Sequence, residues 1–200
     1  MKIKMNLEMA TAFAAMITAV VAVIVAIIQT NIMREEAEME REHARLSVQP
    51  SLWVFRNTHV TADESNLSYQ ILNKGLGPAS IEQFEVFIDG QLVKTWDEAF
   101  STLSDGEFRT KGEEQNITAV SYSSVPPGHI IPAESKITPI NLYRHRELIL
   151  LLLNSGERME FSACFCSVYK DCWKTSSIGT RPEPVKECKT NEERYFLGNK

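Results

Sequence analysis

One uncharged stretch, from Ala10 to Ile28, constrains this chain more than any other feature. The only polar side chains within it belong to Thr11 and Thr18. At about 1.5 Å rise per residue, a helix of this length spans roughly 28 Å, close to the ~30 Å hydrocarbon core of a bilayer. The stretch predicts a transmembrane helix, so the rest of the chain is expected to be a domain held at a membrane.

This helix is interpreted as a retained signal anchor over residues 10–29, with a cleaved signal peptide as the alternative. Lys2 and Lys4, in a short tail of residues 1–9, provide the positive region that both kinds of segment have. A cleaved signal peptide has an apolar region of about 7–15 residues and then a small-x-small cleavage site. Here the apolar run is longer, and residues 29–36 contain no such site.

Positive charges on both sides leave the orientation of the helix nearly balanced. Lys2 and Lys4 lie on one side, and Arg34, Arg41 and Arg45 lie on the other. The distal arginines are spread over a longer stretch, and a short tail before a long domain fits an N-in, C-out arrangement. We expect a single-pass protein of the inner (cytoplasmic) membrane whose domain is periplasmic or extracellular.

Alanines recur along one side of this helix at spacings of three and four residues. Small residues let two helices approach closely, and close packing drives helix association in lipid. The pattern predicts a homo-oligomer, and the alternative is a chance alignment of a residue common in such helices. The seam consists of Ala12, Ala15, Ala19, Ala22 and Ala26.

Residues 30–49 are charged and favour a helix. Glu38 and Arg41, for example, are three residues apart and form a stabilising pair on one helix face. Pro50 pushes the residue before it out of the helical region. The sequence therefore predicts a solvated helical stalk that continues the membrane helix and ends before Pro50.

The charge of the chain excludes one class of partner. The formal net charge is −5, and residues 1–46 contribute five Lys and Arg against six Glu, or −1, which leaves −4 for the remainder. A mildly acidic domain lacks the positive surface of a nucleic-acid binder. We therefore expect no nucleic-acid partner.

All four cysteines lie in the last fifth of the chain. An even, clustered count predicts one or two disulfides in an oxidising compartment. Free buried thiols are an alternative, as is a four-thiolate zinc site in the cytosol. The spacing lacks the paired C-x2-C of structural zinc sites, so no metal is assigned. The cysteines are Cys164, Cys166, Cys172 and Cys188.

From Pro50 onward the chain has the pattern of a β protein. Short apolar runs separated by Gly and Pro turns predict an antiparallel, immunoglobulin-like β-sandwich over residues 50–178. Asp89-Gly90 between two such runs is a strong hairpin signal. The predicted strands are Ser51–Asn57, Leu67–Leu72, Ile81–Ile88, Gln91–Trp96, Ile117–Tyr122, Ile137–Leu142 and Met159–Tyr169.

Two other segments are interpreted as helical. Asp97–Leu103 is expected to form a helical turn capped by Asp97. Glu147–Leu153 is predicted as a short buried helix, with a buried strand as the alternative. Residues 179–200 are polar and are expected to form a loosely held tail unless Cys188 anchors them.

A glycine-containing segment connects the second and third predicted strands. It reads Asn73-Lys74-Gly75-Leu76-Gly77-Pro78-Ala79-Ser80-Ile81. The glycines provide positive φ or a close backbone approach, and Pro78 fixes the exit into the next strand. Asn73 can hydrogen-bond its own loop. The third glycine and following helix of a dinucleotide site are missing, so we interpret the segment as a structural corner.

This segment resembles the N-x-G-x-G-P-A-x-I motif of small, mostly uncharacterised bacterial single-pass membrane proteins. Phe87-Ile88-Asp89-Gly90 matches the same group, as does the stretch from Tyr169 to Trp173. The resemblance implies an anchor and a stalk followed by an immunoglobulin-like, adhesion-related sandwich. It implies no activity, because the group has no settled one.

No catalytic motif is found in the sequence. The histidines lack metal-type spacing, and no serine-nucleophile elbow, phosphate loop or zinc-protease motif occurs. We therefore expect no enzyme activity and no cofactor, but a membrane-tethered interaction module that binds a protein or glycan partner. The alternative is an oligomerising membrane effector or sensor with its sandwich in the cytosol.

Overall fold

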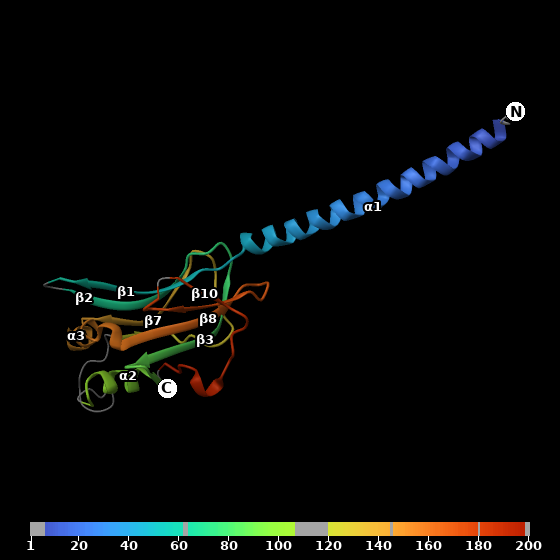
Figure 1. Cartoon of the computed structure of the whole chain (residues 1–200). Coiled ribbons are helices and arrows are strands. Elements are labelled where there is room, and N and C mark those ends of the chain that lie inside the picture. Colours follow the sequence, from blue (N-terminus) through green and yellow to red (C-terminus); the bar gives the residue numbers. More distant parts are fainter. Residues whose placement is uncertain (1–6, 62–63, 107–119, 145, 180, 199–200) are drawn as a thin grey trace. The chain divides into compact units, whose positions relative to one another are not determined.

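The computed structural model describes residues 7–61, 64–106, 120–144, 146–179 and 181–198 (Figure 1). The chain divides into two compact units, Met1–Leu46 and Ser47–Lys200. The first unit is formed by a helix, and the second is formed by β-sheets with short helices.

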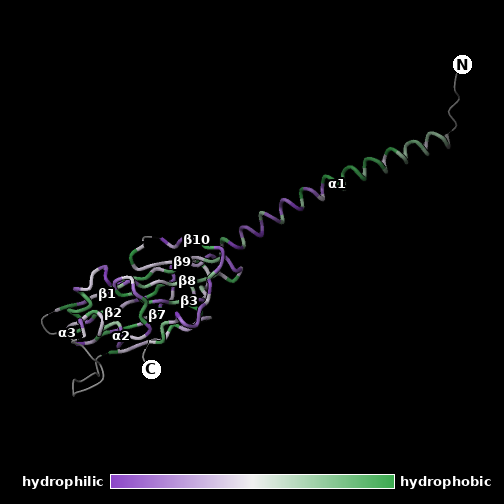
Figure 2. The backbone as a smooth tube through the Cα atoms, turned by 60° about the horizontal axis from the view of Figure 1, so that its bottom comes forward, coloured by the Kyte–Doolittle hydropathy of each residue, from purple (hydrophilic) through white to green (hydrophobic). Residues whose placement is uncertain are grey.

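Helix α1, Leu7–Ser47, is continuous over 41 residues, so the predicted anchor and stalk form one element. Figure 2 shows that α1 is apolar in its first part and more hydrophilic toward its end. Residues 11–28 are exposed on all sides of the helix. A helix with apolar side chains all round needs an apolar environment. The helix is long and apolar enough to cross a membrane, as the sequence predicted.

Two antiparallel sheets build the second unit (Figure 1). The first has the strand order β1-β2-β7-β5, and the second has the order β10-β9-β8-β3-β4, with β6 also paired to β3. The strands of the first sheet are β1 (Leu52–Val60), β2 (Ser65–Asn73), β5 (Val120–Tyr122) and β7 (Lys136–Tyr143). Those of the second are β3 (Ala79–Ile88), β4 (Gln91–Val93), β6 (His129–Ile131), β8 (Met159–Cys166), β9 (Cys172–Ser176) and β10 (Glu183–Val185). Of the strand predicted at Ile117–Tyr122, residues 117–119 lie outside the described residues, and the remainder is β5.

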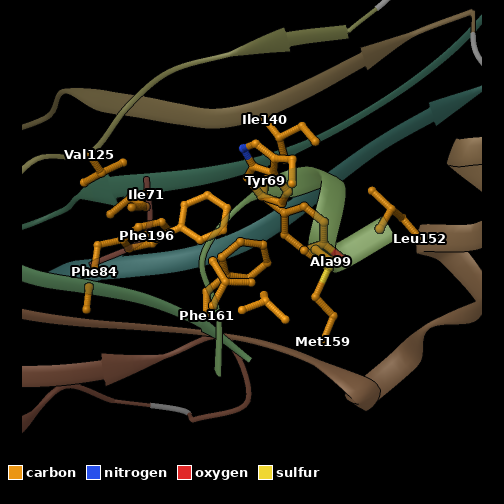
Figure 3. Close-up of a cluster of buried hydrophobic side chains, with 14 of the residues drawn as sticks. Tyr69, Ile71, Phe84, Ala99, Val125, Ile140, Leu152, Met159, Phe161 and Phe196 are labelled. Atoms are coloured by element: carbon orange, nitrogen blue, oxygen red, sulfur yellow. The ribbon is translucent and has the colours of Figure 1, made fainter. Parts of the chain in front are cut away.

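Aromatic side chains join the two sheets through one hydrophobic core (Figure 3). Tyr69 of β2 and Phe161 of β8 come from different sheets, and their ring centroids lie 4.4 Å apart. The ring of Phe161 also lies 6.1 Å from those of Phe84 and Trp96. Each of these side chains is at most 5% exposed. Face-to-face packing of two antiparallel sheets confirms the coarse prediction of a β-sandwich.

The hairpin predicted at Asp89-Gly90 joins β3 to β4. Ile88 pairs with Gln91, and φ is 50° at Asp89 and 76° at Gly90. A type I′ turn requires positive φ at both central residues, and its twist matches that of the flanking strands. The Asp89 carboxylate accepts a hydrogen bond from Arg158 Nη2 (2.8 Å), which holds its pKa below the usual value. This ion pair ties the turn to the start of β8.

Helix α2, Trp96–Leu103, corrects one predicted cap. Its N-cap is Thr95 and not Asp97. The Thr95 hydroxyl accepts a hydrogen bond from the Glu98 N–H (3.2 Å), and the Glu98 carboxylate accepts one from the Lys94 N–H (2.7 Å). This T-x-x-E pattern satisfies two amide groups at the helix start. It also lets the helix begin at Trp96, which is fully buried.

Helix α3, Arg146–Asn154, decides between the two interpretations of the apolar run at 147–153. The run is helical. Leu148, Ile149 and Leu152 are buried, whereas Leu150 is 46% exposed. One buried face and one exposed face are what a helical period gives at the surface of a core.

Residues 181–198 belong to the sandwich. The loosely held tail predicted at 179–200 was conditional on Cys188, and Cys188 is anchored by its disulfide to Cys164. β10 extends the second sheet, and Phe196 is only 7% exposed, with its ring 4.8 Å from that of Trp96. β6 and β4 pair with the two ends of β3 and leave its middle open. The Phe196 N–H donates to the carbonyl of Phe84 in that gap (3.3 Å). The C-terminal segment therefore closes an edge that would otherwise expose backbone groups.

Candidate functional site

Asn73, at the end of β2, organises the corner between β2 and β3. Its side chain is fully buried. Its Nδ2 donates to the carbonyls of Gly77 (2.8 Å) and Ile131 (3.0 Å). Its Oδ1 accepts the N–H groups of Gly75 (3.0 Å) and Ser51 (3.2 Å). One amide thus uses both donors and both lone pairs to join its own loop, β6 and the chain that enters β1.

The two glycines of this corner let residues 48–51 pass directly over it. A Cβ atom on Gly77 would collide with the backbone of Val48, and one on Gly75 would collide with that of Gln49. The Leu76 N–H donates to the Gln49 carbonyl (2.9 Å). Neither glycine has a positive φ, so their role is the close backbone approach. We call residues 48–51 and 73–77 together the clamp.

The clamp explains where α1 ends. The helix stops at Ser47, before the residue preceding Pro50 is reached. The Lys74 N–H donates to the Ser51 carbonyl (2.8 Å), which gives the chain after the helix an extended path. Beyond the loop, Pro78 leads into β3, where Ala79 and Ile81 are fully buried. The clamp therefore fixes the first residues of the second unit immediately after the helix.

Replacing Gly77 by Ala should destabilise the second unit by about 3 kcal/mol, because the added methyl group displaces the backbone of Val48. Thermal unfolding of the full-length protein in detergent, followed by tryptophan fluorescence, measures this effect. Gly179→Ala is the matched control, since a Cβ atom there meets only ordinary contacts at 3.7 Å or more. Equal melting temperatures for both variants would contradict the role given to the clamp.

The four cysteines form two disulfides on one face of the second sheet. Cys164 is joined to Cys188, and Cys166 is joined to Cys172. Cys164 and Cys166 alternate along β8 with the fully buried Ala163, so both point away from the core. The Cys164–Cys188 bridge attaches the C-terminal segment to β8. These bridges occupy the thiols that a zinc site would need.

A cleft of about 430 Å³ lies at one edge of the sandwich. β1 is the edge strand of the first sheet, and the opposite wall follows the residues before β8 and after β9. The lining residues are Phe55, Arg56, Tyr69, Gly156, Glu157, Met159, Ser177 and Ile178. A concave site with an apolar lining and a few polar groups is the usual form of a ligand site.

Arg56 and Tyr69 provide polar groups in this cleft. The Arg56 side chain is exposed, and its Nη1 donates to the carbonyl of Leu152 (3.3 Å). The side chains of Arg56 and Ser155 lie near the Tyr69 hydroxyl and act to lower its pKa. Burial raises the pKa of Tyr69 despite these partners. The hydroxyl is therefore protonated at neutral pH, and the guanidinium is the positive group of the cleft.

The cleft has the chemistry of a binding site. A guanidinium offers several donors in a plane that suit a carboxylate or adjacent hydroxyl groups. Phe55, the neighbour of Arg56 on β1, also lines the cleft and is 38% exposed, so it adds apolar surface at this edge. No sequence motif marks this site, because its residues come from segments about a hundred residues apart. Only the packing of the two sheets brings them together.

A second, smaller cleft of about 320 Å³ contains part of the basic run at 143–146. Val60, Ile149 and Leu153 provide its apolar lining, and Arg144 and Arg146 lie beside them. Arg144 pairs with Glu64 at 3.6 Å, and both side chains are mostly exposed. An exposed pair of this kind contributes little, so this cleft is a weaker candidate.

The predicted alanine seam lies on α1, where all five alanines are exposed. Thr18 donates a hydrogen bond to the carbonyl of Ala15 (2.9 Å), and Thr30 donates one to that of Ala26 (2.8 Å). Both hydroxyl groups are thus satisfied within the helix. This leaves a surface of small side chains along the seam.

The fold defines a class of protein in which a long apolar helix is followed by a two-sheet β domain. The chain belongs to the family described as a domain of unknown function, DUF8453, whose model matches residues 8–147. The match begins in α1 and extends to the start of α3, so the apolar helix is part of the family pattern together with most of the sandwich. A search of curated proteins finds no match.

Proposed function

We propose that this protein is a membrane-tethered, non-catalytic interaction module whose sandwich binds a protein or glycan partner at the cleft beside β1. The observation that carries the proposal is the combination of Arg56, Tyr69 and the exposed Phe55 in one concave site. Arginine and aromatic residues are the residue types that dominate binding energy at interfaces.

The surface next to the cleft supports a macromolecular partner. Trp53 and Phe55 are two residues apart on β1, so their side chains share one face of the strand. They are 44% and 38% exposed. β1 pairs with β2 along its whole length without a register shift, and it is the last strand of its sheet. A regular edge strand with aromatic side chains offers both backbone hydrogen bonds and apolar contacts.

The apolar helix and the clamp support a module that is tethered to a membrane. The apolar part of α1 supplies the membrane span, and the clamp holds the first residues after the helix to the sandwich. Two antiparallel sheets around an aromatic core also support an immunoglobulin-like sandwich. We include the immunoglobulin-like fold and the resemblance to adhesion-related bacterial membrane proteins in the proposal.

The disulfides support an N-in, C-out orientation, with the sandwich in the periplasm or outside the cell. Disulfides persist in oxidising compartments and are rare in the cytosol. All four cysteines are bonded. Bonded cysteines thus favour the tethered module over an effector whose sandwich faces the cytosol.

Labelling of intact cells with a membrane-impermeant maleimide should therefore require prior treatment with an impermeant reductant. The expected result is labelling of the full-length protein in reduced intact cells and none without reduction, because the disulfides block the thiols. A cytosolic protein with a free cysteine serves as the control for cell integrity. Labelling that appears only after lysis and needs no reductant would contradict this orientation.

A photo-crosslinking residue at position 55 should capture the partner in cells. The expected result is a discrete adduct, and Arg56→Ala should lower its yield by about tenfold, because a charged hydrogen bond is lost. Position 168 is the matched control, since Val168 is 61% exposed and lies beyond the far end of β8. The same adduct from both positions, or no effect of Arg56→Ala in a folded protein, would contradict the assigned site.

We further propose that two copies associate through the seam at Ala12, Ala15, Ala19, Ala22 and Ala26. Leucines at positions 19 and 22 should block close approach and reduce dimerisation in a membrane association assay by about tenfold. Ala14→Leu is the control, because Ala14 lies on another face of the helix. Association that survives the double substitution would show that the seam is not the interface.

A further inference from the structure

The two disulfides are in direct contact with each other. Cys166 Sγ lies 3.7 Å from Cys188 Sγ, although each atom is bonded to a different partner. The sulfur atoms of Cys166, Cys172 and Cys188 all lie within 4.8 Å of one another. The sheet places them together. Cys164 and Cys166 are two residues apart on β8 and therefore share one face, and Cys172 on β9 lies directly across from Cys166.

The two disulfides connect different parts of the second sheet. Cys166–Cys172 closes a loop with a sequence separation of 6 between strands that are already hydrogen-bonded. The Ser167 N–H also donates to the Asp171 carbonyl across the turn (2.8 Å). The β8–β9 hairpin therefore has its own backbone contacts. Cys164–Cys188, with a separation of 24, instead fastens the C-terminal segment. A short closed loop also removes less chain entropy than a long one.

We propose that this pair of disulfides is a thiol–disulfide exchange site whose substrate is an external dithiol. A thiolate of the dithiol attacks Cys172 Sγ, and Cys166 leaves as a thiolate. The second thiol of the reductant then releases Cys172 as a thiol, and the reductant departs as a disulfide. Two electrons have passed from the dithiol to the hairpin bridge.

The second step takes place within the protein. The Cys166 thiolate attacks Cys188 Sγ, with which it is already in contact. A Cys166–Cys188 bond forms, the Cys164–Cys188 bond breaks, and Cys164 leaves as a thiolate that takes a proton from water. Exchange of this kind requires a thiolate in contact with the disulfide sulfur that it attacks, and the 3.7 Å contact meets this requirement. The product has one disulfide and thiols at Cys164 and Cys172.

The exchange moves the attachment point of the C-terminal segment without releasing it. Cys188 remains bonded to β8, but two residues farther along the strand, a shift of roughly 7 Å. The segment beyond Cys188 contacts β3, where Arg194 pairs with Glu85 (2.6 Å) and the Asn191 N–H donates to Gln83 (3.1 Å). The site thus couples a redox step to the segment that closes the edge of β3.

The test starts from full-length Cys172→Ser protein in detergent, in which Cys166 is a thiol without any reductant. Acid quenching stops exchange by protonating thiolates, after which N-ethylmaleimide labelling and peptide mapping locate the thiols. We expect one population labelled at Cys166 and another at Cys164, with the Cys164 label about tenfold above its level in the wild-type protein. Cys166→Ser is the matched control, and we expect its label at Cys172 alone.

Labelling of the Cys172→Ser protein at Cys166 alone would overturn the proposal. So would equal labelling of Cys164 in the Cys166→Ser control, because exchange would then not depend on the contact of Cys166 with Cys188. Wild-type protein treated with limiting dithiothreitol gives a test that needs no substitution. We expect Cys164 and Cys172 to be labelled together first. First labelling of Cys166 with Cys172, or of Cys164 with Cys188, would also refute the exchange step.

Discussion

The buried amide of Asn73 is the interaction on which the rest of the second unit depends. It has no contact with water and forms four hydrogen bonds, so every group around it is fixed in place. Through Gly77 and Ser51 it joins the loop between the two sheets to the chain that arrives from the helix. A buried polar group that is fully satisfied specifies one arrangement, because any other leaves a donor or acceptor unpaired at a cost of about 1–3 kcal/mol.

The second sheet is completed from both of its ends by covalent and apolar contacts. β10 and the Cys164–Cys188 bridge hold the C-terminal segment at one side. Phe196 then enters the core between Phe84 and Trp96, where its backbone also fills the gap in the pairing of β3. The segment is polar in composition but structurally part of the sandwich. The Cys164–Cys188 bridge therefore fastens the segment that covers the open edge of β3.

The DUF8453 family model matches residues 8–147, so the family pattern includes residues of both units of this protein. The match includes the apolar helix, the clamp and the two strands, β1 and β2, that form one wall of the cleft. An interaction module gains from such a design, because a tether raises the local concentration of the binding site at the membrane. Within the second unit the clamp begins close to its first residue, since the Ser51 N–H donates to Asn73 Oδ1.

Local patterns predicted the elements that local physics controls. The uncharged run gives α1, since a span of apolar side chains needs no partner to be recognised. Asp89-Gly90 gives the hairpin, since both residues accept positive φ. The Thr95 cap was also present in the sequence as T-x-x-E, but the prediction chose the acidic Asp97, two residues farther along the chain. The helix at Leu148–Leu152 stayed ambiguous, because a short apolar run fits either period.

By itself, the sequence determined the long apolar helix, the β character of the domain, the hairpin and the corner at 73–81, because each depends on neighbouring residues. Tertiary structure alone decided the pairing of the cysteines, the burial of Phe196 and the cleft of Arg56 and Tyr69. These features join segments far apart in the chain, and their positions follow from how the two sheets pack. No periodicity or motif encodes such a distance, so only the folded core brings the residues together.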